Sequence, residues 1–276
     1  MANLTGKVAI ITGATRKRGL GRAIAIALAK DGADVVPTGT GKPSSMSDDE
    51  RDIPDDELRE GWRGAHDVAE ECASFGVRTW AAVLDVTDRG SVKRLVADTV
   101  ERFGRVDILV NNATYPRGSD RVSLQELNDD IWSRIIDVNL TGTMLCSKYV
   151  AAQMIQQGDG GSIVSISSIA GRRGSANTAA YSTSKAAMHV LSDSLAAELG
   201  PYGITSNVVA PGFIDTARID ELRDGDRWER RLRSIPAGRA GTVDETADLV
   251  RYLCGPESRY LSGQTIYVDG AETRGG

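Results

Sequence analysis

The chain has 276 residues and a mass of 29.4 kDa, and its 41% hydrophobic and 26% charged residues are typical of a folded globular protein. A net charge of −5 and a pI near 5.2 argue against a nucleic-acid partner, because binding to phosphates needs a concentrated basic face. No apolar run reaches the roughly 18 residues of a membrane span, so we expect no membrane partner. A small molecule is the expected partner.

The three cysteines, Cys72, Cys146 and Cys254, are far apart and have neither CxxC nor Cys/His metal-ligand spacing. This pattern predicts free packing thiols in a reducing compartment and no metal site. The N-terminus lacks the basic stretch and long apolar core of a signal peptide. We therefore expect a cytoplasmic protein.

Strand-like and helix-like segments alternate along the chain, beginning with the apolar run Lys7–Thr12, a glycine loop and an alanine-rich helix at Leu20–Lys30. Further strands are predicted at Asp34–Val36, Thr79–Leu84, Ile108–Val110, Ser162–Ile166, Thr205–Val209 and Thr265–Val268. Further helices are predicted at Ala65–Phe75, Ser91–Phe103, Asp130–Gln156 and Ala179–Leu199. The alternation predicts one α/β domain over residues 1–276, a Rossmann-type doubly wound parallel sheet of seven strands with helices on both faces.

Two segments interrupt the alternation. Residues 40–64 carry eight acidic and four basic residues together with Pro and Ser, which predicts an acidic surface insertion with one helical turn. Residues 213–240 alternate in charge and contain few apolar side chains. Because such a segment has little with which to anchor itself, it is expected to form a mobile helical lid over the substrate.

The loop after the first strand contains Gly13, Gly19 and Gly21. Glycines at a strand-to-helix turn allow positive φ and close approach of a pyrophosphate, while the free N–H groups at the helix start face the anion. The loop thus predicts a dinucleotide site, although a tight turn alone is the alternative. Five residues separate the first two glycines, and they include the cations Arg16, Lys17 and Arg18.

Tyr181 and Lys185 are four residues apart on a predicted helix, so they share one face. Because a nearby ammonium favours a phenolate, this tyrosine is suited to act as a general acid or base. Ser168 lies thirteen residues upstream, at the end of the predicted fifth strand, where open parallel sheets collect ligands. Ser167 is the alternative to Ser168.

These motifs together resemble the short-chain dehydrogenase/reductase family, whose glycine loop usually has three residues between the first two glycines. The resemblance implies that Ser168 holds a substrate carbonyl and that Tyr181 exchanges a proton with it. Lys185 would assist Tyr181 and bind the nicotinamide ribose. Asn139, within Asp137–Gly142, resembles the family's asparagine that bends a helix and holds a water of the proton relay.

The resemblance also implies cofactor contacts after several strands. Asp85 matches the family's aspartate that binds the adenine amino group, and Asn111–Thr114 matches its Asn-Asn-Ala-Gly motif with threonine in place of the glycine. A Pro-Gly turn at Pro211 precedes residues that reach the nicotinamide. The predicted cofactor-binding residues are Gly13, Thr15, Arg16, Arg18, Gly19, Leu20, Gly21, Thr40, Asp85, Val86, Asn112, Ala113, Tyr181, Lys185, Pro211, Gly212, Ile214 and Thr216.

The choice of cofactor depends on Gly39, which stands where NAD-preferring members of the family typically carry an acidic residue. With no carboxylate there to oppose a 2′-phosphate, NADP(H) is favoured over NAD(H). Phosphate pairing is further favoured by the cations Arg16, Lys17, Arg18 and Lys42. The alternative is that Asp48 or Asp49 of the insertion binds the ribose of NAD.

The function implied is an NAD(P)-dependent oxidoreductase that transfers hydride between nicotinamide and a ketone or secondary alcohol. A 3-oxoacyl thioester (acyl-carrier-protein) reductase is the alternative within this class. From another class, the same fold can serve as a non-catalytic dinucleotide-sensing protein. The resemblance further implies a homotetramer built on the helices at 130–156 and 179–199, with a dimer as the alternative.

Overall fold

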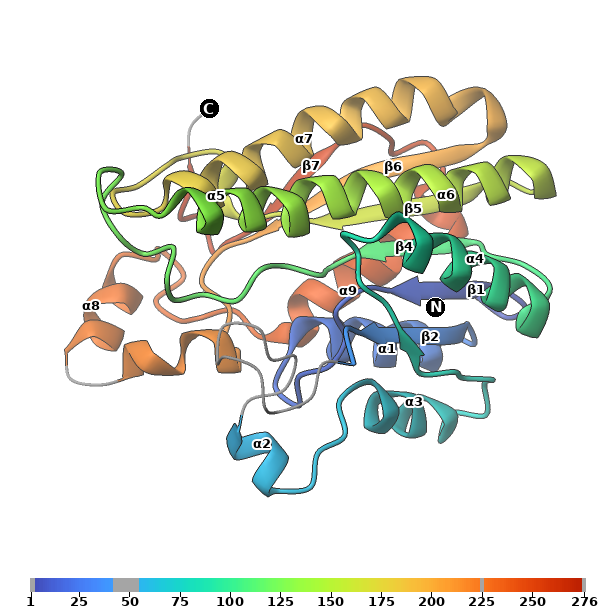
Figure 1. Ribbon diagram of the computed structural model, residues 1–276, viewed down its shortest axis with the longest axis horizontal. Coiled ribbons are helices and arrows are strands. Elements are labelled where there is room, and N and C mark those ends of the chain that lie inside the picture. The colour runs from blue at the N-terminus through green and yellow to red at the C-terminus, as the bar shows by residue number, and fades with distance from the viewer. Residues whose placement is uncertain (1–2, 42–54, 224–225, 275–276) are drawn as a thin grey trace.

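The computed structural model describes residues 3–41, 55–223 and 226–274. Within them a seven-stranded sheet has the order β3-β2-β1-β4-β5-β6-β7, and every neighbouring pair is parallel (Figure 1). The predicted Rossmann-type doubly wound sheet is confirmed. The strands are β1 (Val8–Ile11), β2 (Asp34–Gly39), β3 (Ala82–Val83), β4 (Ile108–Asn111), β5 (Gly161–Ile166), β6 (Ile204–Pro211) and β7 (Thr265–Val268).

Helices cover both faces of this sheet (Figure 1). The α-helices of the described residues are α1 (Leu20–Lys30), α2 (Asp55–Arg59), α3 (Ala65–Ala73), α4 (Arg89–Phe103), α5 (Asp129–Ile136), α6 (Gly142–Gln157), α7 (Ala179–Leu199), α8 (Arg227–Arg233) and α9 (Val243–Cys254). One buried cluster joins α1, α3 and α9 to the sheet, and a second joins α4, α6 and the end of α7 to its other face. In the described part of the chain, no helix is long and apolar enough to cross a membrane.

The three cysteines are buried and free, as the sequence predicts. The third strand is shorter than predicted: only Ala82–Val83 is paired as a strand, and Thr79 forms an isolated bridge with Val35. This strand lies at the edge of the sheet, where β2 is its sole partner. Because an edge strand has hydrogen-bond partners on one side only, the chain is not paired with β2 between the Thr79 bridge and Ala82.

The helix predicted at Asp130–Gln156 is divided by a π-helical segment at Asp137–Thr141, which separates α5 from α6. A π-segment inserts a residue into the helical turn and rotates the side chains that follow it. Asn139 lies in this segment and is 0% exposed. The structure therefore places a π-helical segment at the asparagine for which the family resemblance implies a bend.

Helix α9 is absent from the sequence-based prediction, although the sequence contains its signals. Thr242 caps the helix and Glu245 completes a capping box, with both hydrogen bonds present. Ala247, Val250 and Leu253 follow at helical spacing and are buried against α1. The predicted charge-rich lid at 213–240 ends just before this box.

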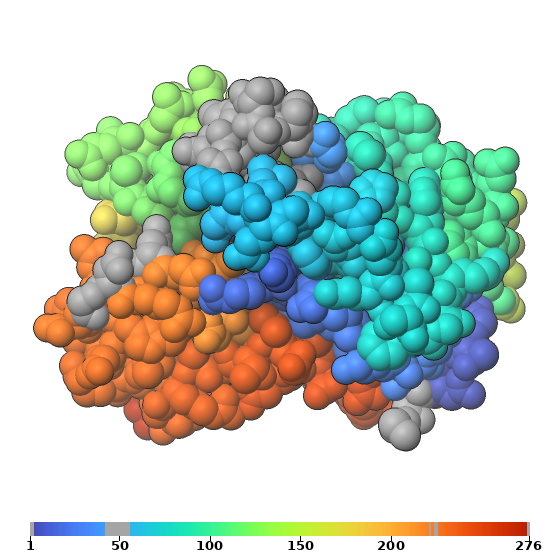
Figure 2. Space-filling view, turned by 90° about the horizontal axis from the view of Figure 1, so that it is seen from below, coloured from blue at the N-terminus to red at the C-terminus, as the bar shows by residue number. Residues whose placement is uncertain are grey.

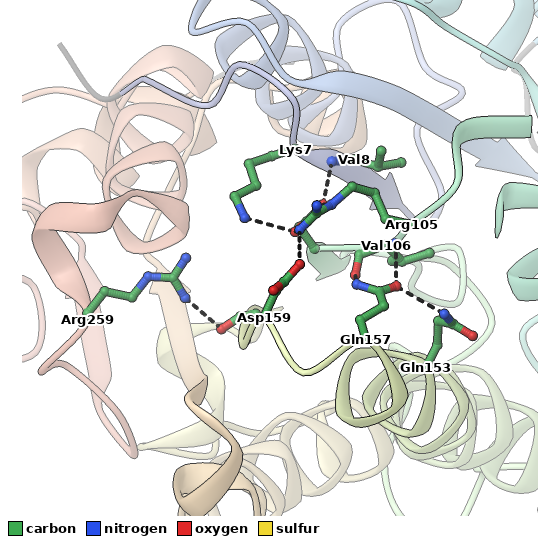
Figure 3. Close-up of polar contacts among 10 residues, drawn as sticks. Lys7, Val8, Arg105, Val106, Gln153, Gln157, Asp159 and Arg259 are labelled. Atoms are coloured by element: carbon green, nitrogen blue, oxygen red, sulfur yellow. Dashed lines mark hydrogen bonds and ion pairs between the residues drawn. The ribbon is translucent and has the colours of Figure 1, made fainter.

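A buried carboxylate joins the amino ends of the central strands, at the edge opposite the glycine loop (Figure 3). Asp107, whose side chain is 3% exposed, accepts hydrogen bonds from the Val8 backbone N–H and from the side chains of Lys7 and Arg105 at 2.6 to 3.0 Å. Burial raises the pKa of Asp107, but the hydrogen bonds from Arg105, Val8 and Lys7 outweigh it and hold the pKa below its usual range. The ionised carboxylate therefore stabilises the alignment of β1 with β4.

Replacing this carboxylate with an amide tests its contribution. We expect Asp107→Asn to lower the free energy of unfolding by about 2 kcal/mol at pH 7, less than for a fully buried pair because both cations are partly exposed. The stabilisation is present above the unfolded-state pKa of about 3.9 and is lost as the pH falls through the lower folded-state pKa. Urea denaturation of both proteins between pH 7 and pH 3 should show the difference shrinking below pH 4.

Asp159→Asn is the matched control, because Asp159 pairs with the same Arg105 but its side chain is 57% exposed. Its free energy of unfolding should change by less than about 0.5 kcal/mol. Equal losses of unfolding free energy in Asp107→Asn and Asp159→Asn would contradict the stabilising role of Asp107.

Candidate active site

A cavity of about 1370 Å³ lies at the carboxyl ends of the strands. Every predicted cofactor-binding residue lines it, together with Ser168, Tyr181 and Lys185. Asn139 is the one predicted site residue that does not. Such a crevice beyond the strand ends is where open parallel sheets bind ligands.

The glycine loop lies tightly against the end of β4. Gly13 has φ of +67°, and a Cβ there would stand 2.8 Å from the Ala113 Cα atom. A Cβ on Gly21 would stand 2.6 Å from the Asn112 amide nitrogen, which donates to the carbonyls of Thr12 and Gly13 at 2.9 and 3.0 Å. Side chains are thus excluded from the backbone that lines the cavity. The N-cap residue of α1, Gly19, has no side chain to cap the helix, so the loop fits the pyrophosphate of a dinucleotide.

The end of the acidic insertion supports this loop. Glu57 accepts a hydrogen bond from the backbone N–H of Lys17 at 2.9 Å, and Glu60 pairs with the Lys17 ammonium at 2.7 Å. The Trp62 indole N–H donates to the carbonyl of Thr15 at 2.6 Å. The insertion, predicted as a surface segment, therefore ends in the single turn of α2 and in side chains that brace the lengthened loop.

The predicted lid contacts the loop from the other side. Arg18 pairs with Asp220 at 2.8 Å and Asp215 at 3.4 Å, both in the segment at 213–240. Figure 2 shows loop atoms, in deep blue, between the cyan residues around 55–62 and the orange residues of this segment. In the lid, Ala217–Arg223 forms a 3-10 helix that is followed by α8.

These ion pairs change the predicted electrostatics of the loop. Lys17 and Arg18 each pair with a carboxylate, and Arg18 lines the cavity whereas Lys17 does not. That these cations favour phosphate pairing stays a prediction. Arg16 lines the cavity and is the loop cation with no carboxylate partner in the described part of the chain. Lys42, Asp48 and Asp49 lie outside the described residues. Gly39 ends β2 at the cavity wall, as predicted.

Tyr181 and Lys185 lie in the first two turns of α7, and both face the cavity. The Lys185 ammonium lies 5.9 Å from the Tyr181 ring centroid and donates to the carbonyl of Ile166 at 2.8 Å. The residue is 2% exposed. Burial, followed by repulsion from Arg218, lowers the pKa of Lys185 to about 7.

The structure separates the two candidate serines. Ser167 is buried, and its hydroxyl is engaged by the Lys185 carbonyl at 2.9 Å and the His189 ring at 2.8 Å. The Ser168 hydroxyl accepts a hydrogen bond from the Ala170 N–H at 3.1 Å, an arrangement that keeps its own proton available to donate. The geometry thus favours Ser168 as the serine that binds a substrate oxygen.

The Asn139 side chain connects three elements instead of reaching the cavity. Its oxygen accepts from the Tyr115 N–H at 2.8 Å and from the Thr114 hydroxyl at 3.1 Å, and its nitrogen donates to Ser184 at 2.9 Å. Thr114, which replaces the glycine of the family motif, therefore adds a hydrogen bond to this network. The water-holding role of Asn139 stays a prediction.

Two arginines beside Tyr181 were not predicted from the sequence. The guanidinium carbons of Arg121 and Arg218 lie 4.5 and 5.6 Å from the Tyr181 ring centroid. Arg121 belongs to the long connection after β4, and Arg218 belongs to the lid. No motif marks either residue, and only the fold brings them together.

The buried lysine generates a prediction about stability. Between pH 7 and about 10.4 the unfolded chain binds more protons at Lys185 than the folded protein does, so stability at this site rises with pH. Above pH 7, the free energy of unfolding of the wild type should rise relative to that of Lys185→Met by up to about 1.4 kcal/mol per pH unit. Denaturation of the cofactor-free proteins at pH 6.5, 7.5 and 8.5 measures this difference. Lys93→Met, at an exposed lysine of α4, is the control. If the difference in unfolding free energy between the wild type and Lys185→Met did not change with pH, the lowered pKa of Lys185 would be contradicted.

Comparisons with known proteins agree with this geometry. A family model described as enoyl-(acyl carrier protein) reductase matches residues 60–271. The chain is 37% identical over 265 residues to 3-oxoacyl-(acyl-carrier-protein) reductase FabG of Salmonella typhimurium, covering 96% of each chain.

Two similar solved structures carry different cofactors. An NAD⁺-bound xylitol dehydrogenase has a TM-score of 0.81 and 28% identity, with 97% of this chain and 99% of that chain covered. A candidate 2-deoxy-D-gluconate 3-dehydrogenase from Agrobacterium tumefaciens with bound NADP has a TM-score of 0.82 and 30% identity, with 98% and 97% covered. The catalytic motif, the sheet and these relatives agree: the chain belongs to the short-chain dehydrogenase/reductase family of NAD(P)-dependent oxidoreductases.

Proposed function

We propose that this oxidoreductase interconverts a ketone and a secondary alcohol with Tyr181 as the general acid and base. The observation that carries the proposal is the cavity, in which Ser168, Tyr181 and Lys185 line the same space as the glycine loop. Ser168 would bind the substrate oxygen, while Lys185 and Asn139 support Tyr181. The relatives described above are named as reductases and dehydrogenases, which favours an enzyme over the non-catalytic alternative.

In the reductive direction the chain's own residues handle the oxygen and the proton. Ser168 donates a hydrogen bond to the carbonyl oxygen and polarises it. Tyr181 donates a proton to the developing alkoxide, and the cations around its ring stabilise the phenolate that remains. A bound nicotinamide supplies the hydride, or accepts it when the alcohol is oxidised. In oxidation Tyr181 takes the proton back.

The same cavity residues would hold the cofactor. Gly13, Gly19 and Gly21 offer backbone to the pyrophosphate, Asp85 would bind the adenine amino group, and Thr216 would reach the nicotinamide. Asp85 already accepts hydrogen bonds from Thr87 through one carboxylate oxygen, which orients the side chain. We propose NADP(H) as the preferred form. At the end of β2 stands Gly39 in place of a carboxylate that would oppose a 2′-phosphate, and Arg16 is the loop cation without a carboxylate partner among the described residues.

A second candidate function is reduction of a 3-oxoacyl thioester. It is favoured by the similarity to FabG over nearly the whole chain. Turnover of an acetoacetyl thioester with a kcat/KM well above that of simple ketones would select this function.

The residues at 213–240 are proposed to cover the substrate, since Phe213, Ile214, Arg218 and Leu222 line the cavity. The mobility of this lid stays a prediction. The homotetrameric assembly and the cytoplasmic location likewise stay predictions from the sequence.

Removal of one hydroxyl tests the catalytic assignment. Tyr181→Phe is expected to lower kcat by about 10²- to 10⁴-fold, because the proton donor is lost, while the ring keeps its place. Titration of protein fluorescence with NADPH should give a nearly unchanged Kd. Tyr202→Phe, at an exposed tyrosine beyond α7, is the control and should retain full activity. Near-normal turnover by Tyr181→Phe would refute the role.

Cofactor preference is tested at the glycine loop. Arg16→Gln is expected to weaken NADPH binding about tenfold through loss of a charge-assisted phosphate contact, and to leave NADH binding almost unchanged. Lys17→Gln removes the same charge from a residue already paired with Glu60 and should alter neither affinity by much. Equal affinities of the wild type for NADPH and NADH would count against the preference.

A further inference from the structure

Positive charge gathers at the end of the cavity near Tyr181, on the buried Lys185 and the half-buried Arg121 and Arg218. Arg121 and Arg218 both line the cavity and stack near the Tyr181 ring, at 4.5 and 5.6 Å from its centroid. Lys185 lies on the same ring at 5.9 Å. Three cations from three separate segments therefore surround the phenol at which the substrate oxygen is expected.

The two arginines have hydrogen-bond donors that the protein does not satisfy. Arg218 donates from Nη1 to the carbonyl of Tyr115 at 3.1 Å, but its Nη2 atom is buried with no hydrogen-bond partner among the described residues. The Nε atom of Arg121 is likewise buried without a hydrogen bond in the described chain, and Asp120 approaches it only to 3.4 Å. A buried donor without an acceptor is destabilising, so such atoms indicate a place for a ligand.

Carboxylates around the cavity do not balance this charge. Asp120, 2% exposed, is the acid next to Arg121, and one of its oxygens also accepts from the Gly118 N–H. Of the other acids, Asp220 pairs with Arg18, and Glu272 pairs through one oxygen with Arg231 at 2.5 Å. Glu272 Oε2 is buried without a hydrogen bond in the described chain, and Asp137 also lines the cavity. Burial lowers the pKa of both Arg121 and Arg218. Asp120 and Tyr181 offset part of this effect, while neighbouring arginines add to it.

We propose that the substrate carries an oxyanion, a carboxylate or a phosphate, that Arg218 and Arg121 bind beside the carbonyl group reduced at Tyr181. Guanidinium groups recognise both anions through paired N–H donors. The inference rests on the proposed function, since it assumes that the reacting carbonyl lies at Tyr181. Binding would supply acceptors for Arg218 Nη2 and Arg121 Nε.

The cofactor does not account for these arginines. Its phosphates have their own site at the glycine loop, where Gly13 and Gly21 expose backbone and Arg16 lines the cavity. Tyr181 marks the proposed reacting end, and Arg218 lies between it and the loop, near enough to Arg16 for the two cations to repel each other. Glu272 also lines the cavity, but its pairing with Arg231 makes a site for a substrate ammonium the weaker alternative.

The reaction that follows is reduction of an oxo acid, or of a phosphorylated ketone, to the corresponding hydroxy compound. The carbonyl carbon gains a hydride, the oxygen gains the proton of Tyr181, and the reduced nicotinamide is oxidised in the same step. The oxyanion keeps its charge throughout. In the reverse direction a hydroxy acid or a phosphorylated secondary alcohol is oxidised.

Pairs of substrates that differ in charge alone test the proposal. The 2-, 3- and 4-oxo acids of four to five carbons are compared with their methyl esters, and dihydroxyacetone phosphate is compared with dihydroxyacetone, by following NADPH and NADH oxidation. We expect kcat/KM for at least one anion to exceed that of its neutral partner by about 10- to 100-fold. A larger anion-to-neutral ratio of kcat/KM for the oxo acids would indicate a carboxylate substrate, and a larger ratio for dihydroxyacetone phosphate would indicate a phosphate.

Arg218→Gln and Arg121→Gln should each reduce this anion-to-neutral ratio about tenfold or more, whereas Arg218→Lys should retain part of it. Arg233→Gln is the matched control, because it removes the same charge from α8 at a side chain that is 67% exposed and outside the cavity. The anion-to-neutral ratio of kcat/KM should be the same in Arg233→Gln as in the wild type.

Calorimetric binding of unreactive butanoate and phosphate, with butanamide as the neutral comparison, provides a readout independent of turnover. Anion binding should weaken in Arg218→Gln and persist in Tyr181→Phe. The proposal is overturned if the wild type prefers the neutral partners, or if neither arginine variant changes the ratio. In either case continued turnover of neutral ketones leaves the proposed function intact, whereas no turnover of any ketone or alcohol would overturn the proposed function itself.

Discussion

Asn112 ties the end of β4 to the glycine loop that follows β1, and the cavity depends on this contact. The amide nitrogen donates to two successive carbonyls, those of Thr12 and Gly13, and the Asn112 backbone N–H donates to the Thr12 hydroxyl at 3.0 Å. The loop backbone is thereby held where a side chain at Gly13 would collide with Ala113. Because β1 and β4 are neighbours in the sheet, residues about a hundred positions apart form one wall.

From this wall a chain of hydrogen bonds reaches the catalytic helix. The residues after Asn112 hold the Asn139 oxygen, and the Asn139 nitrogen binds the Ser184 hydroxyl. Ser184 in turn donates to the carbonyl of Tyr181 at 2.7 Å. The π-segment makes this possible, because the additional residue turns Asn139 inward between α5 and α7. The glycine loop and Tyr181 are thus linked through these hydrogen bonds and the backbone of residues 112–115.

Electrostatics divides the cavity into two regions. At the rim, the acidic insertion and lid neutralise Lys17 and Arg18, so the loop is held by ion pairs that are largely exposed and individually weak. Near Tyr181, Lys185 is buried and Arg218 is half-buried, and burial lowers the pKa of both. Keeping charge there lowers the stability of the free protein and creates a site whose occupants must supply negative charge or hydrogen-bond acceptors.

The sequence by itself determined the order of strands and helices, the glycine turn and the Tyr181–Lys185 pair, since each depends on residues within one or two turns of one another. Two elements differ from the sequence-based prediction: β3 is short because an edge strand has one partner, and α9 begins at the local capping box of Thr242 and Glu245. Only the tertiary structure decided which cations stay unpaired. Arg218 reaches Tyr181 from a lid, and Glu60 reaches Lys17 from the insertion, because the parallel sheet gathers the ends of distant segments at one edge.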